Sequence, residues 1–353
     1  MSEMSDMTSI RSIKRSRSRR ILAATSGFAL VAAFCYCLIL GQGAVKLSPV
    51  EVIEVLTGGG TQQAINVVWD LRLPVAIATV LVGAALGLAG AWTQTMARNP
   101  LASPDILGVS GGAAVLVVAG TVVTRPAWSE GVPTFWWRAA LALLGALVIV
   151  GLLVLLGGFG TSQRVVVIGL ALSFLTQSLV QYLLLRADLT RATDAQTWLA
   201  GSTGFVRMEA LLPMVLGLLP FVVLGLCVTR DVPLLSHDDA TASTLGVNVT
   251  RVRAILLIAA TGIVAVVVSF VGPIGFVALL APQLAKLVAG TPTPHPLCST
   301  FAGSALLAAC AVVAGALPFT SPVGLVTAII GGPALVLLVW LAARRGTLKG
   351  MVQ

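Results

Sequence analysis

The chain consists almost wholly of long apolar runs separated by short polar connections, and this pattern restricts its fold most strongly. Residues 76–91 and 254–271, for example, contain no charged side chain. Charged residues make up 10% of the 353 residues, against about 25% in a soluble domain. A transmembrane helix needs about 20 apolar residues, whereas strands of a membrane barrel would alternate apolar and polar positions. The sequence therefore predicts an all-α polytopic membrane protein.

The positions of the apolar runs predict about ten transmembrane helices in one domain. An even number of spans puts both termini on one side of the membrane. We expect a basic cytoplasmic tail at residues 1–20, a ten-helix domain at 21–343 that includes a cytoplasmic segment at 230–252, and a short cytoplasmic tail at 344–353. The predicted spans are residues 21–41, 73–96, 106–123, 139–156, 165–185, 210–228, 254–271, 274–289, 297–317 and 323–343.

The basic residues support this topology, because the cytoplasmic loops of membrane proteins carry an excess of Lys and Arg. The predicted inner side holds 15 of the 22 Lys and Arg residues. The net charge of +9 thus follows membrane sidedness, and no nucleic-acid partner is needed to explain it. We expect the N-terminal basic residues to fix the topology, with binding of membrane lipids or of a partner as the alternative. The inner-side residues are Arg11, Lys14, Arg15, Arg17, Arg19, Arg20, Arg98, Arg164, Arg230, Arg251, Arg253, Lys286, Arg344, Arg345 and Lys349.

Several kinds of chemistry are missing from the sequence. The five cysteines form no C-x-x-C pair, so neither a disulfide framework nor a zinc site is indicated. The chain has no G-x-x-x-x-G-K-[ST] motif, so any ATP must be bound by another chain. The apolar runs hold almost no ionisable group, which disfavours an ion-coupled carrier. Lys286 is the nearest exception, and its side chain can reach the inner surface. We expect no catalytic residue, cofactor or metal in this chain.

The polar segment at residues 230–252 predicts a short helix outside the membrane. Ser236 or Asp238 can cap its N-terminus, where acidic side chains are favoured. Small residues follow, then Leu245, and Gly246 can end the helix in a left-handed conformation. Such a helix could bind an ATPase subunit. The alternative is that it is an ordinary amphipathic helix of a loop, with no partner.

Five motifs together resemble a known family of permeases. They occur in order from about Leu71 to the C-terminus. The resemblance is to the FecCD family, whose members import iron–siderophore complexes, haem and vitamin B12. The motifs are R-L-P at 72–74, G-A-x-x-Q-x-x-x-R-N-P-L-A-x-P-x-x-L-G-V-S-x-G-A at 90–113, D-x-x-A-x-x-L-G at 239–246, V-G-P-I-G-F-V at 271–277, and P-V-G-x-V-T-A-x-I-G-G-P at 322–333.

The resemblance implies a set of partner proteins. A second permease subunit, identical or homologous, would complete a dimer with a central pathway. A cytoplasmic ATPase dimer would supply the energy, and an external solute-binding protein would deliver the substrate. The ATPase would dock on the short helix through Asp239, Ala242, Leu245 and Gly246.

The resemblance also implies a cytoplasmic gate. Its residues would be Asn99 and Leu101 of the second motif, with Thr161 and Ser162 of the loop before the fifth span. Leu101 can close a passage by apolar contact, and the amide and hydroxyl groups can form hydrogen bonds across a dimer axis. For Asn99, a simple turn between two spans is the alternative.

Two departures from the family pattern affect the predicted roles. The family carries a second Arg shortly after R-L-P, used against acidic residues of the binding protein, and this chain has Val75 there. Arg72 is therefore predicted either to dock the binding protein or to act as a topology or interface anchor. The family's P-H-x-x-R reads Pro282-Gln283-Leu284-Ala285-Lys286, which keeps the charge and loses the His.

The leading functional hypothesis is a permease subunit in the bacterial cell membrane. It would move a ferric siderophore inward by alternating access, driven by a separate ATPase chain. Import of haem or cobalamin by the same mechanism is an alternative within the class. An ion-coupled secondary transporter, and a structural membrane subunit without a pathway, are the alternatives from other classes.

Overall fold

The structure is a computed structural model that describes residues 2–43, 47–123, 125–158, 163–317 and 321–344. Every regular element within these ranges is helical. The α-helices are α1 (Ser2–Gly41), α2 (Pro49–Leu56), α3 (Gln62–Asn66), α4 (Leu73–Ala97), α5 (Val109–Val122), α6 (Thr134–Gly157), α7 (Gln163–Arg186), α8 (Leu189–Leu199), α9 (Met208–Leu226), α10 (Asp239–Thr244), α11 (Val249–Val271), α12 (Val277–Ala289), α13 (Pro296–Ala316) and α14 (Val323–Arg344).

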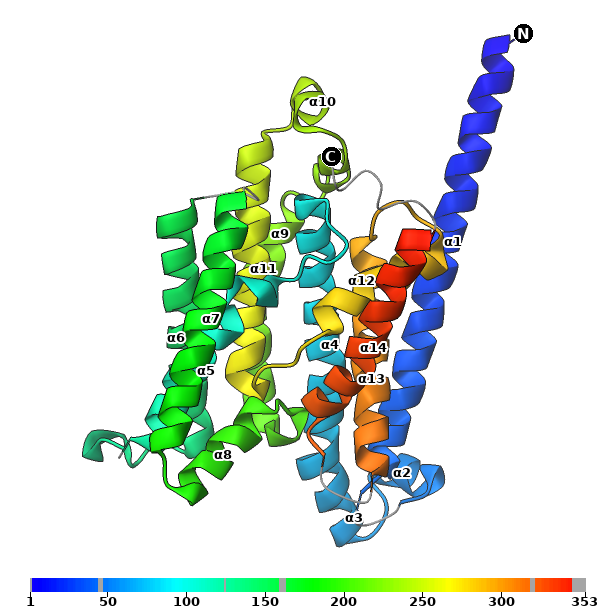
Figure 1. Ribbon diagram of the computed structural model, residues 1–353. Helices are drawn as coiled ribbons and strands as arrows, with labels where there is room; N and C mark the ends of the chain where they lie inside the picture. The colour runs from blue at the N-terminus through cyan, green and yellow to red at the C-terminus, as the bar shows by residue number, and fades with distance from the viewer. Residues whose placement is uncertain (1, 44–46, 124, 159–162, 318–320, 345–353) are drawn as a thin grey trace.

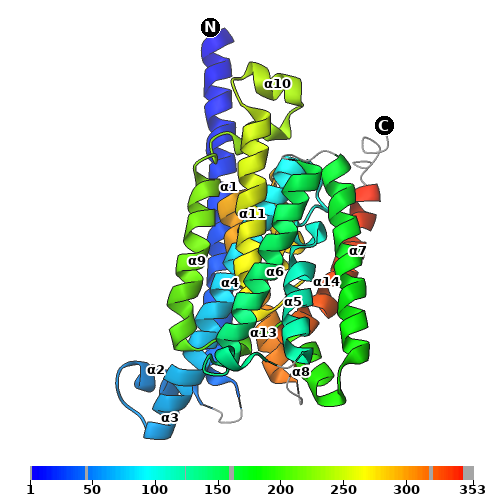
Figure 2. The ribbon, with the colours of Figure 1, turned by 90° about the vertical axis from the view of Figure 1, so that its left-hand side faces the viewer.

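The long helices run side by side in one bundle (Figure 1). The N-terminus of α1 and the short helix α10 lie at the same end of this bundle, which we call the coupling end. Helices α2, α3 and α8 lie at the opposite end. Figure 2 shows that α10 stands beyond the start of α11, and that α1 also extends past this end. Helix α1 is unbroken from the predicted N-terminal tail into the first span.

In the described part of the chain, seven helical stretches are long and apolar enough to cross a membrane. Helices α5, α12 and the Val323–Leu338 part of α14 are shorter apolar helices. Each of the ten predicted spans therefore coincides with an apolar helix, which confirms the all-α multi-pass fold. The seven stretches are Arg15–Gly41, Gln62–Ala97, Thr134–Gly157, Arg164–Arg186, Met208–Leu226, Val249–Val271 and Pro296–Ala316.

Helices α5 and α12 are short because a non-helical segment precedes each of them inside the bundle (Figure 1). After α4 the chain passes through Arg98 (φ 50°), a 3-10 turn at Pro104–Leu107 and Gly108 (φ 84°) before α5 begins. Before α12 it passes Gly272 (φ 74°) and Phe276 (φ 68°). Left-handed residues and prolines interrupt a helix, so both helices begin three residues later than the sequence predicts.

Helix α4 lies at the centre and packs against α11, α12 and α13. Small residues allow the close approach of α4 and α13 that membrane helices favour. A Cβ atom added to Gly83 would lie 2.4 Å from the carbonyl oxygen of Gly303, and one added to Gly87 would lie 2.2 Å from that of Ser299. These glycines are therefore required by the packing of the two backbones.

Candidate coupling and gate site

The polar segment between α9 and α11 folds as a 3-10 turn (Val232–Ser236) followed by α10. Asp238 caps α10, because its carboxylate accepts hydrogen bonds from the Thr241 amide at 2.9 Å and the Thr241 hydroxyl at 2.7 Å. These bonds lower the pKa of the Asp238 carboxyl. Gly246 ends the turn with φ 87°. The short helix predicted from the sequence is thus present, with the cap and the terminating glycine at the expected positions.

The four predicted docking residues do not share one face of α10. Ala242 is fully buried against the bundle, whereas the Leu245 side chain is 57% exposed. Gly246 is also exposed, directly after Leu245. The Asp239 side chain is 52% exposed but is engaged by side chains of this same chain. Of these four residues, Leu245 and Gly246 are therefore the two that are exposed without a side-chain contact to the rest of the chain among the described hydrogen bonds and ion pairs.

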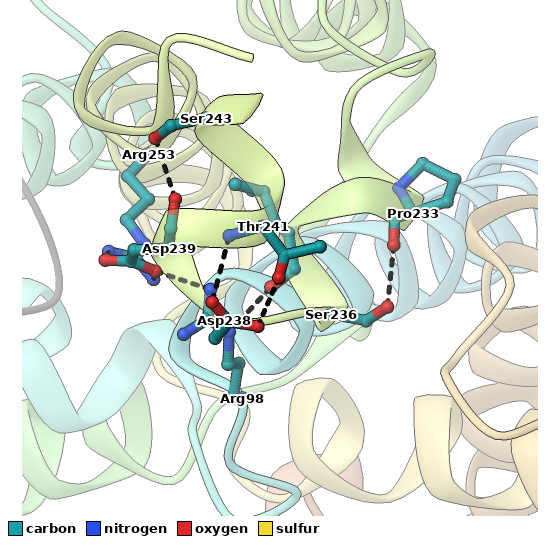
Figure 3. Close-up of polar contacts among 9 residues, drawn as sticks. Arg98, Pro233, Ser236, Asp238, Asp239, Thr241, Ser243 and Arg253 are labelled. Atoms are coloured by element: carbon teal, nitrogen blue, oxygen red, sulfur yellow. Dashed lines mark hydrogen bonds and ion pairs between the residues drawn. The ribbon is translucent and has the colours of Figure 1, made fainter. Parts of the chain in front are cut away.

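Asp239 joins two arginines that lie far from it in the sequence (Figure 3). Arg253, at the start of α11, donates from Nη1 to Oδ2 at 2.8 Å and from Nη2 to Oδ1 at 2.8 Å. Arg98, just after α4, donates from Nη2 to Oδ1 at 2.5 Å. The hydrogen bonds from Arg253, and less strongly the one from Arg98, hold the pKa of the Asp239 carboxyl below its usual value. The sequence predicted neither arginine as a partner.

Arg98 connects the end of α4 with the segment before α10. Its Nε donates to the carbonyl oxygen of Leu235 at 2.7 Å, and its Nη2 reaches Asp239. Leu235 is fully buried, so this contact is fixed against the bundle. Arg98 itself adopts a left-handed backbone, which ends α4 and turns the chain toward Asn99. One side chain thus bridges the coupling segment and the predicted gate turn.

The predicted gate residues Asn99 and Leu101 form one turn directly after Arg98. The Asn99 Oδ1 accepts a hydrogen bond from the Leu101 amide at 2.9 Å, and both side chains are exposed. Leu101 is 38% exposed, so it is available for contact with another surface. Thr161 and Ser162, the other predicted gate residues, lie outside the described residues.

Gln283 of α12 bonds this turn directly, and Gln94 of α4 bonds both α12 and Gln283 beside it. The Gln94 Nε2 donates to the Leu279 carbonyl oxygen at 2.9 Å. The Gln283 Nε2 donates to the Gln94 Oε1 at 2.5 Å and to the Pro100 carbonyl oxygen at 3.3 Å. Gln283 occupies the position where the family pattern has His, so the amide supplies a donor at this place. Next to these groups lies a cavity of about 160 Å³ that Asn99 also lines.

Arg72 lies at the opposite end of the bundle, remote from α10. Its side chain is 8% exposed, and its Nη1 donates to the Leu40 carbonyl oxygen at 2.8 Å. This bond ties the start of α4 to the end of α1. Arg72 also lines a pocket of about 760 Å³ between the ends of α1, α13 and α14. The structure thus places Arg72 in a buried contact between α1 and α4.

Asp105 is a polar residue in the bundle that the sequence did not single out. Its Oδ1 accepts a hydrogen bond from the Ser110 hydroxyl at 2.6 Å. The two residues line a pocket with the segment from Pro273 to Phe276 and with Leu335 of α14. Among the described residues, no group of three or more His, Cys, Asp or Glu could hold a metal ion.

An apolar helical bundle with a small exposed helix at one end fits a membrane subunit that another chain drives. This fold, together with the matches to known proteins given next, shows the permease subunit of an ATP-binding-cassette importer, which is a transport subunit and not an enzyme. The chain belongs to the FecCD transport family, whose model matches residues 29–341. It is a multi-pass protein of the bacterial cell membrane. An importer of this class also contains an ATPase, a binding protein and a second permease subunit.

Individual relatives cover nearly the whole chain. The ferric enterobactin permease FepG of Escherichia coli K12 is 32% identical over 88% of this chain and 94% of its own. The ferric dicitrate permease FecC of the same organism is 35% identical over 89% and 92%. Other similar proteins are named for hemin and for vitamin B12. A solved metal-chelate type ABC transporter in an inward-facing conformation aligns with a TM-score of 0.75 at 25% identity, covering 91% of this chain and 99% of its own.

Proposed function

We propose that this permease moves a ferric siderophore into the cytoplasm by alternating access, with ATP hydrolysed by a separate subunit. Support for the substrate class comes from relatives named for ferric enterobactin and ferric dicitrate. Import of haem or cobalamin is the alternative within the class, because other relatives are named for these cargoes. The ion-coupled carrier is set aside, because the chain belongs to a family of ABC permeases.

The single observation that carries the proposed coupling is the exposure of Leu245 on a helix that stands outside the bundle. A leucine that is 57% exposed at the end of α10 can fill an apolar groove on an ATPase subunit. The buried Ala242 holds the other face of α10 against the bundle. In this proposal the coupling end is cytoplasmic, in agreement with the excess of basic residues predicted on that side.

The proposed gate is the Asn99–Leu101 turn together with Thr161 and Ser162 of the loop before α7. Leu101 would meet its counterpart in the second permease subunit and close the pathway toward the cytoplasm. The exposure of the Leu101 side chain supports this role, because a gate residue must be able to reach a partner subunit. Leu101→Ala should therefore leave the transport pathway open toward the cytoplasm, so that small solutes cross the membrane without ATP.

We propose that the binding protein docks at the opposite end of the bundle, which is external when the coupling end is cytoplasmic. A direct role for Arg72 requires its guanidinium to leave the Leu40 carbonyl oxygen. An anchoring role requires no such movement. Arg72→Lys keeps the charge but shortens the reach, so loss of binding-protein affinity in this variant would favour docking.

The decisive test of the coupling assignment is the affinity of the purified permease for its ATPase subunit. Leu245→Ala should weaken this affinity about tenfold, because an apolar side chain at the centre of a contact is lost. Gly246→Ala should weaken it as well, because Gly246 has φ 87°, which other residues rarely adopt.

Leu287→Ala is the matched control, because Leu287 lies on α12 and is 55% exposed, close to the value for Leu245. This variant should bind the ATPase like the wild-type protein. The coupling assignment is wrong if Leu245→Ala and Leu287→Ala bind the ATPase equally well.

A further inference from the structure

The Arg98 side chain, directly after α4, forms hydrogen bonds with the coupling segment. Its guanidinium makes two contacts with that segment, from Nε to Leu235 at 2.7 Å and from Nη2 to Asp239 at 2.5 Å. Leu235 precedes α10, and Asp239 is its first residue. A displacement of α10 therefore acts directly on Arg98.

Asp239 is engaged on both carboxylate oxygens by groups of its own chain. Arg253 forms a two-pronged pair with Oδ1 and Oδ2, and Arg98 adds a third bond to Oδ1. Two-pronged arginine–carboxylate pairs fix geometry better than single contacts do. Both carboxylate oxygens thus accept bonds within this chain, and the carboxylate joins the end of α4 to α10 and α11.

Arg98 is followed directly by the turn of Asn99 and Leu101. That turn is held on its other side by Gln283 of α12, which donates to the Pro100 carbonyl oxygen at 3.3 Å. The left-handed backbone of Arg98 fixes the direction in which the turn leaves α4. The turn therefore lies between two contacts. Arg98 bonds the coupling segment on one side, and Gln283 of α12 bonds Pro100 on the other.

We propose that Arg98, Asp239 and Arg253 form an ionic link that transmits movement of α10 to the Asn99–Leu101 turn. The three are positioning residues, and Asp239 acts within this chain instead of binding the ATPase. The inference rests on the proposed function, since it assumes that α10 receives the ATPase. It deepens that function by assigning the path from the docking helix to the gate.

The test uses the complete complex of permease, ATPase and binding protein in lipid vesicles. The quantities measured are the affinity for the ATPase, the rate of ATP hydrolysis and the amount of substrate taken up per ATP. Arg98→Gln and Asp239→Asn should keep ATPase affinity within about twofold and lose about tenfold in uptake per ATP. The double variant should be no worse than the poorer single variant, because both changes break the same link.

Two further variants control for charge and for fold. Arg98→Lys keeps the positive charge and should recover at least half of the wild-type uptake per ATP. Arg251→Gln removes an exposed charge from the first turn of α11, two positions before Arg253, and should keep the wild-type uptake per ATP. Leu245→Ala should show the opposite pattern, with ATPase affinity lost.

The proposal is overturned if Asp239→Asn loses ATPase affinity as Leu245→Ala does, because Asp239 would then be a docking residue. It is also overturned if Arg98→Gln keeps wild-type uptake per ATP. Loss of the assembled complex in Asp239→Asn would overturn it as well, since the contacts would be a structural support only. If Leu245→Ala instead keeps full ATPase affinity, the proposed docking helix is wrong, and this result is separate from the other three.

Discussion

At the scale of single residues, the contacts of Asp239 go beyond the docking role that its place in the motif implies. The motif predicted a docking residue, but the carboxylate lies between Arg98 and Arg253 of the same chain. Exposed ion pairs contribute only about 0–1 kcal/mol to stability, and the Asp239 side chain is half exposed. Its importance is therefore expected in the geometry it fixes and not in the stability of the fold.

The pKa of Asp239 leads to a prediction about pH. Because the pKa is lowered, mainly by hydrogen bonds from Arg253, the carboxylate stays charged above its ordinary pKa of about 3.9. The link is thus complete at neutral pH and is lost only as the pH falls through the lowered value. Between about pH 5 and 8, the ratio of uptake per ATP in wild type to that in Asp239→Asn should be constant. If wild-type uptake per ATP falls to the level of Asp239→Asn within this pH range, the assignment is contradicted.

At the scale of helices, the contact between α4 and α13 depends on backbones that touch. A Cβ atom at Gly87 would lie 2.2 Å from the Ser299 carbonyl oxygen, which belongs to the backbone and cannot move away alone. The helices would have to separate, and overpacking of this kind costs about 1–3 kcal/mol. The glycines of α4 thus determine how closely the central helices approach.

Gly87→Ala should therefore lower the free energy of unfolding in detergent by about 1–3 kcal/mol. Gly151→Ala in α6 is the matched control, because nothing lies within 4 Å of the Cβ that it would gain. This variant should be as stable as the wild type or slightly more stable, since Ala favours helices over Gly. Equal stability of the two variants would show that α4 and α13 can move apart without cost.

The sequence predicted the helices well and the connections between distant segments poorly. Apolar runs identify membrane helices directly, because the bilayer demands about 20 apolar residues whatever lies beside them. The start of α12 was missed because Gly272 and Phe276 have left-handed backbones in the structure. The Arg98–Asp239 pair was missed because 141 positions separate its members, and no local pattern records such a contact.

At the scale of the whole molecule, α10 and the extension of α1 lie at one end of the bundle (Figure 2), and Arg98 joins the Asn99–Leu101 turn to α10. Arg72 and its pocket lie at the other end. This separation suits a protein that receives energy at one membrane surface and cargo at the other. ATP-driven coupling and transport of a siderophore cargo can therefore be measured together in a sealed vesicle.

The most direct measurement is the accumulation of iron by vesicles that contain the complete complex. Binding protein loaded with a labelled ferric siderophore is added outside, and ATP is enclosed inside. Iron should accumulate only when both are present, and Leu245→Ala should lower the initial rate about tenfold while Leu287→Ala does not. Accumulation driven by an ion gradient without ATP, or equal rates in the two variants, would contradict the account.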